Sequence, residues 1–255
     1  MTALLEVSGV SKRFGGLQAV KAVSFRVEKG TIKAVIGPNG AGKTTLFNIV
    51  SGFLAPDAGT ITFRGEPVQG SPPHRVSARG LARTFQHIKL FARMSALENV
   101  MVGRHVRSRA GFVAGMLHLP FTWSEEREVR ARSLDLLDFL GIASLAGAEA
   151  TSLSYGQQRA VELARALASE PEMLLLDEPA AGLNMRETAD LAQLIRRIRE
   201  RGVTVLIVEH DMSLVMSISD EVIVLSYGEK IADGDPRSVQ RDADVIRVYL
   251  GEEDA

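Results

Sequence analysis

Eight residues near the N-terminus, GPNGAGKT, carry the clearest chemical signal in this sequence, and they run from Gly37 to Thr44. They match the pattern G-x-x-x-x-G-K-[ST], in which the glycines allow backbone N–H groups to surround phosphate oxygens. We expect Lys43 to reach the β- and γ-phosphates of a nucleotide and the Thr44 hydroxyl to bind Mg²⁺. The alternative is a glycine-rich turn that carries a surface lysine. The predicted nucleotide contacts in this loop are Gly37, Pro38, Asn39, Gly40, Ala41, Gly42, Lys43, Thr44 and Thr45.

Two adjacent carboxylates, Asp177 and Glu178, follow the apolar residues 173–176. A phosphate loop of this kind needs a carboxylate at the end of a neighbouring strand to hold Mg²⁺. We expect Asp177 to orient the water shell of the metal and Glu178 to act as a general base on the attacking water. His210 ends a second apolar run and would lie at the same edge of a parallel sheet, near the γ-phosphate. Without the phosphate loop, these residues would indicate only a solvated strand end and a structural histidine.

The phosphate loop needs a strand before it and a helix after it. The apolar residues of 31–36 predict the strand. A helix that ends near Gly52 is predicted by apolar residues at helical spacing, namely Leu46, Ile49, Val50 and Phe53. On either side of this unit, residues 23–27 and 59–65 alternate apolar and polar side chains. That alternation predicts short strands in an antiparallel sheet.

The rest of the chain alternates between strand and helix patterns. From about residue 87 to residue 168 the pattern is helical, and Ser124 precedes a long predicted helix. The elements expected after it are a strand at 173–176, a helix that ends at Gly202, a strand at 203–210, a helix from about Asp211 and a hairpin at 221–234. We therefore predict an α/β fold with a mostly parallel sheet, an N-terminal antiparallel β subdomain and an inserted helical subdomain.

Composition excludes several classes of function. The chain has 30 Lys and Arg against 31 Asp and Glu, so its net charge of −1 gives no support to a nucleic-acid binder, which would normally be basic. The absence of cysteine excludes disulfides, thiolate metal sites and cysteine nucleophiles. No stretch approaches the roughly 18 apolar residues of a membrane span, and the first residues lack the apolar core of a signal peptide. We expect a soluble chain.

A second glycine-marked helix start lies at residues 153–159, which read LSYGQQR. Ser154 and Gln157 form the S-x-x-Q pattern of a capping box. A capping box does not require Gly156, however, and it does not explain why the motif accompanies a phosphate loop. The stretch resembles the signature motif of ABC-transporter ATPase subunits, which is normally LSGGQ. Tyr155 departs from that pattern because it replaces the middle glycine.

Other elements of that family occur in the expected order. Phe14 matches the aromatic residue that stacks on adenine, although an aromatic beside a Gly-Gly turn also packs within hairpins. Gln86 matches the Q-loop glutamine, and the resemblance implies that it binds the metal and takes part in catalysis. Residues 180–184, AAGLN, match the D-loop, with Asn184 in place of the usual aspartate. His210 matches the switch histidine.

In this family, the signature helix of one subunit covers the nucleotide that another subunit holds, with its positive dipole end towards the phosphates. The resemblance therefore implies ATP and Mg²⁺ as cofactors and a head-to-tail dimer of ATPase subunits. It also implies a single ABC ATPase domain over residues 1–255, with a nucleotide-binding core at 1–86 and 169–255 and a helical subdomain at 87–168. The residues implied to contact the ATP of the partner are Ser154, Tyr155, Gly156 and Gln157.

Longer stretches are similar to one group within the family, the ATP-binding subunits of branched-chain amino-acid importers. These stretches are RTFQHIKLFARMSALENV, the insert at 103–130, DEPAAGLN, VEHDMSLVMSISD and DVIRVYLGEE. The resemblance implies a second ATPase subunit, identical or a paralogue, together with two transmembrane subunits and, indirectly, a substrate-binding protein. It also implies a peripheral location at the cytoplasmic face of the membrane.

Three alternatives stay open beside this group. Related importers of urea or amides are similar, and so are lipopolysaccharide-type exporters, although the long insert favours an importer. A soluble ABC ATPase that acts on nucleic acid is a third class, against which the near-neutral charge and the single ATPase unit argue.

The insert itself has two interpretations. Arg104, Arg107 and Arg109 precede the apolar stretch 111–121. The first interpretation is a solvated basic face followed by a helix that packs on its own domain. The second is that part of the insert lies near the membrane partner.

Overall fold

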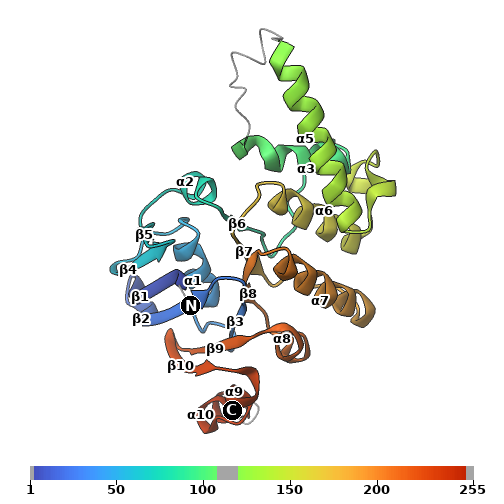
Figure 1. The fold of residues 1–255 in the computed structure, drawn as a ribbon. Coiled ribbons are helices and arrows are strands. Elements are labelled where there is room, and N and C mark those ends of the chain that lie inside the picture. Colours follow the sequence, from blue (N-terminus) through green and yellow to red (C-terminus); the bar gives the residue numbers. More distant parts are fainter. Residues whose placement is uncertain (1–2, 108–119, 251–255) are drawn as a thin grey trace.

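The computed structural model describes residues 3–107 and 120–250. Its strands form two sheets, with helices around them (Figure 1). One sheet is antiparallel and has the strand order β2-β1-β4-β5. Its strands are β1 (Ala3–Phe14), β2 (Leu17–Glu28), β4 (Ala58–Phe63) and β5 (Glu66–Pro67). The predicted antiparallel sheet is therefore confirmed.

The strands β1 and β2 are longer than the sequence predicted. Each has 12 residues, whereas we expected short strands and did not expect β1 at all. The pairing register between them shifts at several points, for example between Val7 and Val10. Such bulges interrupt the two-residue alternation of side chains. The alternation was therefore visible only over part of β2.

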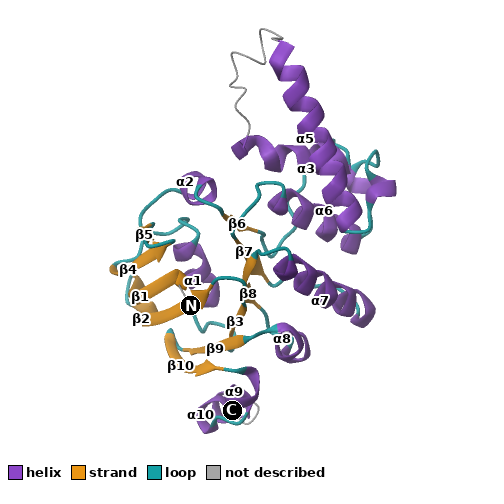
Figure 2. Cartoon of the chain, in the orientation of Figure 1, coloured by secondary structure: helices purple, strands orange, loops and turns teal. Residues whose placement is uncertain are grey.

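The second sheet is mostly parallel and has the strand order β10-β9-β3-β8-β7-β6 (Figure 2). Its strands are β3 (Ile32–Ile36), β6 (Leu81–Arg83), β7 (Met173–Asp177), β8 (Thr204–Val208), β9 (Glu221–Ser226) and β10 (Glu229–Gly234). Only the hairpin of β9 and β10 is antiparallel within the sheet described. Every residue of β3, β7 and β8 is buried, as expected for strands that are covered on both faces. The α/β fold class is thus confirmed.

Helices connect the strands of this sheet. The α-helices are α1 (Lys43–Val50), α2 (Pro73–Ala78), α3 (Ala96–Gly103), α5 (Pro120–Phe139), α6 (Tyr155–Leu167), α7 (Met185–Glu200), α8 (Met212–Ile218), α9 (Pro236–Gln240) and α10 (Ala243–Leu250). Short 3₁₀ helices are η1 (Arg104–Arg107), η2 (Ala143–Leu145) and η3 (Ala150–Ser152). The expected helix start at Asp211 is confirmed, because its side chain caps α8 by accepting from the N–H of Leu214.

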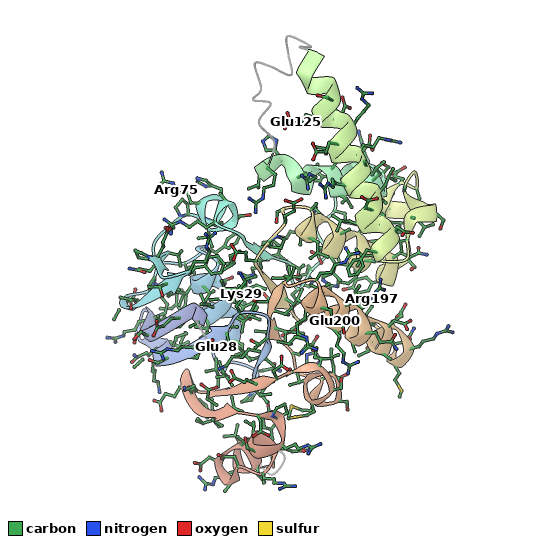
Figure 3. All side chains as sticks on the ribbon, viewed as in Figure 1. Glu28, Lys29, Arg75, Glu125, Arg197 and Glu200 are labelled. Carbon is green, nitrogen blue, oxygen red and sulfur yellow. The ribbon has the colours of Figure 1, made fainter. Side chains whose placement is uncertain are left out.

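Three helices, α3, α5 and α6, come between β6 and β7 in the chain and stand to one side of both sheets (Figure 1). They pack on one another around a core of their own, which includes Leu97, Leu137 and Val161. Helix α7 is joined to this group by Arg197 (Figure 3). Its guanidinium donates to the carbonyl of Phe139 at 3.0 Å and lies 4.5 Å from the centre of that ring. The predicted helical insert is therefore present.

Two expected details of the helices are wrong. The long helix after Ser124 begins earlier, at Pro120, where the fixed backbone angle of proline suits a first helical position. Helix α1 ends at Val50, close to Gly52 as expected, and Gly52 has a left-handed φ of 79°. Phe53 therefore lies beyond the helix, half exposed, and makes an edge contact with the ring of Phe85 instead of joining the apolar face.

The start of the insert is attached to the rest of the chain. Arg104, with only 12% of its side chain exposed, donates to the carboxylate of Glu170 at 2.8 Å, and Arg107 donates to the carbonyls of Ser169 and Glu170. Arg104 is therefore not part of a solvated face. Arg109 and most of 111–121 lie outside the described residues. Among the helices that are described, none is long and apolar enough to cross a membrane.

Candidate nucleotide-binding site

The phosphate loop joins β3 to α1, as the sequence predicted. Its glycines are required by close backbone contacts: a Cβ at Gly37 would collide with the carbonyl of Leu225, and one at Gly42 with the carbonyl of Ala19. Gly42 also caps α1 with a left-handed φ of 99°. The loop therefore packs closely against the backbone of β9 and of β2. Its outer residues, Asn39, Gly40 and Thr44, are exposed, whereas Ala41 is buried and Pro38 and Thr45 are half buried.

Lys43 lies under this loop, with 7% of its surface exposed. Its ammonium group donates to the carbonyl of Gly37 and, at 2.9 Å, to the carbonyl of Pro38. Burial lowers the pKa of Lys43, while the carboxylates of Glu178 and Asp177 act in the opposite direction. The lysine is thus a desolvated cation close to Glu178, the predicted general base, and to Asp177, the predicted metal ligand.

Asp177 ends β7 and is paired with Arg83, the last residue of β6. The two side chains are each 6% exposed and form an ion pair of 2.7 Å between Arg83 Nη2 and Asp177 Oδ2. The other terminal nitrogen of Arg83 donates to Asn48 Oδ1 at 2.8 Å and to Ser51 Oγ at 2.7 Å, both at the end of α1. Arg83 therefore fixes the orientation of Asp177 relative to the helix of the phosphate loop.

Three aromatic rings surround the same guanidinium. Its central carbon lies 5.8 Å from the ring centre of Phe47, 5.6 Å from that of Phe53 and 5.2 Å from that of Phe85. The sequence analysis missed Arg83. In the sequence it is one charge in a short strand, and only its position two residues before Phe85 and three before Gln86 could have drawn attention to it.

Glu178 and Gln86 are brought together, although 92 positions separate them in the chain. The amide of Gln86 donates to Glu178 Oε2 at 2.7 Å. Glu178 has a left-handed φ of 47°, and its N–H donates to the carbonyl of Val208 at 2.9 Å. A left-handed backbone is costly for a residue other than glycine, and such strain is concentrated at functional sites.

His210 follows β8, and 65% of its side chain is exposed. The neighbouring Glu209 is fully buried and accepts from the N–H of Ala180 at 2.8 Å and from the N–H of His210 at 3.1 Å. Burial raises the pKa of Glu209, against the lowering effect of these backbone hydrogen bonds. Glu209 therefore joins Ala180, in the predicted D-loop, to His210. The sequence analysis missed this contact because Glu209 directly follows a buried strand.

Ser154 and Gln157 form the predicted capping box at the start of α6. The N–H of Ser154 donates to Gln157 Oε1 at 2.9 Å, and the N–H of Gln157 donates to Ser154 Oγ at 3.4 Å. Helix α6 belongs to the inserted helices, at a distance from α1 (Figure 1). Among the described residues, no hydrogen bond or ion pair joins 154–157 to 37–45. The structure of one chain does not bring the two glycine-marked helix starts together.

Phe14 ends β1 and is paired with Leu17 across the Gly-Gly turn. It is 47% exposed, and the ammonium of Lys12 lies 5.9 Å from the centre of its ring. The hairpin of β1 and β2 does not bury this ring. The second strand of the hairpin, β2, contacts the phosphate loop through the carbonyl of Ala19. Adenine stacking by Phe14 stays a prediction.

A family model described as "ABC transporter" matches residues 20–181, which is more than half of the chain. The chain belongs to the ABC transporter family. A second model, described as "Branched-chain amino acid ATP-binding cassette transporter", matches residues 229–255. As a member of this family, the chain is an ATPase subunit that binds nucleotide.

Curated relatives of this ABC subunit match over nearly their whole length. It is 47% identical to the high-affinity branched-chain amino acid transport ATP-binding protein BraF of Pseudomonas aeruginosa, with 98% of each chain covered. It is 43% identical to the corresponding protein LivG of Escherichia coli, also with 98% of each covered.

Solved ABC cassettes have the same fold. MJ1267, an ATP-binding cassette of an ABC transporter in its ADP conformation, has a TM-score of 0.86 and 31% identity, with 98% of this chain and 100% of that chain covered. MJ0796, a cassette solved as a dimer bound to ADP and Pi, has a TM-score of 0.77 and 26% identity, with 91% and 99% covered.

The residues predicted to bind Mg²⁺ fit that ion chemically. Thr44, Gln86 and Asp177 offer only oxygen ligands, which Mg²⁺ prefers. The described residues hold no group of three or more His, Cys, Asp or Glu that could ligate a metal on their own. Mg²⁺ is normally bound by one or two carboxylates together with oxygens of the substrate, so phosphate oxygens and water would complete its coordination here.

Proposed function

We propose that this chain is the ATP-hydrolysing subunit of an importer for branched-chain or other hydrophobic amino acids. The support for this substrate class is the name shared by BraF and LivG at 43–47% identity over 98% of the chain. The match of residues 229–255 to the branched-chain amino acid transporter model supports the same class.

The observation that carries the catalytic part of the proposal is the hydrogen bond of Gln86 to Glu178, beside the Asp177–Arg83 pair. Glu178 is the general base for the attacking water, and Gln86 holds its carboxylate in place. Asp177, Thr44 and Gln86 would hold Mg²⁺, which would neutralise charge on the phosphates when bound. Lys43 exchanges its loop carbonyls for phosphate oxygens, and His210 contacts the γ-phosphate. Phe14 stacks on the adenine.

The unit of function is a head-to-tail dimer. The start of α6 is a capped, exposed helix terminus in the helical subdomain (87–168), away from the phosphate loop in the core (1–86 and 169–255). The dimer of MJ0796 with ADP and Pi shows that a cassette of this fold pairs with a second one. Residues 154–157 therefore contact ATP that is held by a partner subunit, either a second copy or a paralogue.

The proposed assembly includes two transmembrane subunits and a substrate-binding protein, and no nucleic acid. The chain would act at the cytoplasmic face of the membrane, where closure around ATP and release after hydrolysis change the state of the transmembrane subunits. ATP shifts that equilibrium because it contacts both ATPase subunits only in the closed dimer.

The decisive experiment replaces Glu178 by Gln in the assembled transporter. The Glu178→Gln variant should still close on ATP but lose at least 99% of its turnover, since general-base catalysis contributes about 100- to 10,000-fold. Glu200→Gln, at an exposed position on α7, is the matched control and should hydrolyse at the wild-type rate (Figure 3). Wild-type turnover by Glu178→Gln would refute the assignment of the base. Uptake of labelled leucine, compared with urea, tests the substrate class.

A further inference from the structure

The two departures of this chain from the usual family motifs, Tyr155 and Asn184, lie in two segments that contact each other, the signature turn and the D-loop. The ring of Tyr155, in the signature turn (Ser154–Gln157), lies directly against Gly182 of the D-loop. A Cβ built on Gly182 would be 3.1 Å from Cε1 and 3.5 Å from Cζ of Tyr155. The first separation is tighter than ordinary van der Waals contact, and the second is within its range. A side chain at position 182 would therefore require the ring of Tyr155 to shift by a few tenths of an ångström.

The other end of Tyr155 contacts Arg159, which is 2% exposed. Arg159 Nη2 donates to the hydroxyl of Tyr155 at 3.2 Å, and its second terminal nitrogen pairs with Glu162 at 2.8 Å. The same guanidinium donates to the carbonyls of Phe85 at 3.0 Å and Gln86 at 3.1 Å. Tyr155 is thus linked to the backbone that carries the Q-loop glutamine.

A second contact joins the same two segments. A Cβ on Gly156 would be 3.0 Å from Glu187 Oε1, so the carboxylate of Glu187 lies against the signature turn. Glu187 Oε2 accepts from the N–H of Asn184 at 2.9 Å, while Asn184 Oδ1 accepts from the N–H of Glu187 at 3.0 Å. Asn184, the second departure, therefore caps α7 at this contact.

We propose that Tyr155 is a positioning residue that fixes the signature turn to the D-loop and to the Q-loop of its own subunit. The inference rests on the proposed function, in which this turn contacts ATP held by a partner. The ring of Tyr155 favours glycine at position 182, and Arg159 extends the link to the carbonyl of Gln86. The turn that contacts the partner's ATP then moves together with the loops around its own catalytic carboxylate.

The test is a double-variant cycle with a matched glycine control. Gly182→Ala places a methyl group against the Tyr155 ring, and Tyr155→Gly in the same chain removes the ring. Because Gly182 has a left-handed φ of 81°, alanine also costs backbone energy there. Gly202→Ala measures that cost alone, since Gly202 has a φ of 86° and a Cβ there would meet nothing within 4 Å.

Two measurements are made on these variants. In the assembled transporter, Gly182→Ala should lower kcat/KM for ATP about tenfold, as expected for overpacking. Tyr155→Gly alone should also lower it, because the link to the D-loop is lost, and adding Gly182→Ala to Tyr155→Gly should cause no further loss. The affinity of the isolated chain for a fluorescent ADP analogue should change less than twofold, because its own phosphate loop is intact. Gly202→Ala should change neither value. A general structural defect in Gly182→Ala would instead lower kcat/KM and the affinity for the ADP analogue together.

In the second measurement, urea unfolding of the isolated chain reports the contact without ATP turnover. Gly182→Ala should lower the urea midpoint more than Gly202→Ala does. In a chain that already carries Tyr155→Gly, the two alanine substitutions should lower the midpoint equally. Equal midpoints for the two alanine variants, wild-type activity of Tyr155→Gly, or a double variant less active than Tyr155→Gly would overturn the inference. Failure of the proposed function is distinct, since it would appear as wild-type turnover by Glu178→Gln.

Discussion

Replacing Arg83 by Met tests the strongest electrostatic contact in the site. The variant keeps an apolar side chain among the three phenylalanine rings but leaves Asp177, 6% exposed, without its cation. Removing one partner of a buried pair costs about 3–5 kcal/mol, because the remaining charge stays buried. For a chain of this size, each kcal/mol lowers Tm by about 2–4 °C, so we expect a loss of about 6–20 °C.

The control for this prediction is Arg26→Met. Arg26 forms an ion pair with Glu6 of the same length, 2.7 Å, but the two side chains are 68% and 40% exposed. An exposed pair contributes about 0–1 kcal/mol. Tm and the urea midpoint should be measured without nucleotide and with EDTA, so that ATP and Mg²⁺ do not add stability.

The double variant Arg83→Met with Asp177→Asn removes the charge that the single variant leaves unpaired. It should recover more than half of the lost stability, because the neutral amide no longer needs a cation. If Arg83→Met is destabilised no more than Arg26→Met, the Arg83–Asp177 pair does not stabilise the site and our reasoning is wrong.

Two further predictions concern two buried ionisable side chains, Lys43 and Glu209. Lys43→Ala should weaken binding of a fluorescent ATP analogue about 10- to 150-fold, since it removes a charged hydrogen-bond donor, and a dissociation constant within threefold of wild type would contradict this. Glu209 has a raised pKa, so its contribution to stability is present below the ordinary value of 4.5 and is lost as pH rises through the raised value. As the pH rises from about 4.5 to about 8, the free energy of unfolding of Glu209→Gln should therefore increase relative to that of the wild type. Urea titrations across this range measure it, and a difference independent of pH would count against it.

Local sequence determined the parts of this protein that depend on short-range geometry. The capping box of Ser154 and Gln157 and the five-residue buried strands each follow from residues within a few positions. The order of these motifs along the chain, together with the resemblance, was enough to predict the α/β fold class.

Tertiary structure alone decided which distant residues meet. Arg83 and Asp177 are 94 positions apart and become neighbours because β6 pairs with β7 in parallel. Glu209 reaches Ala180 because β7 pairs with β8, and Tyr155 faces Gly182 because α6 packs beside the start of α7. The physical reason is that hydrophobic periodicity shows which face of an element is buried and carries no information about its partner, which is selected by packing of the whole chain.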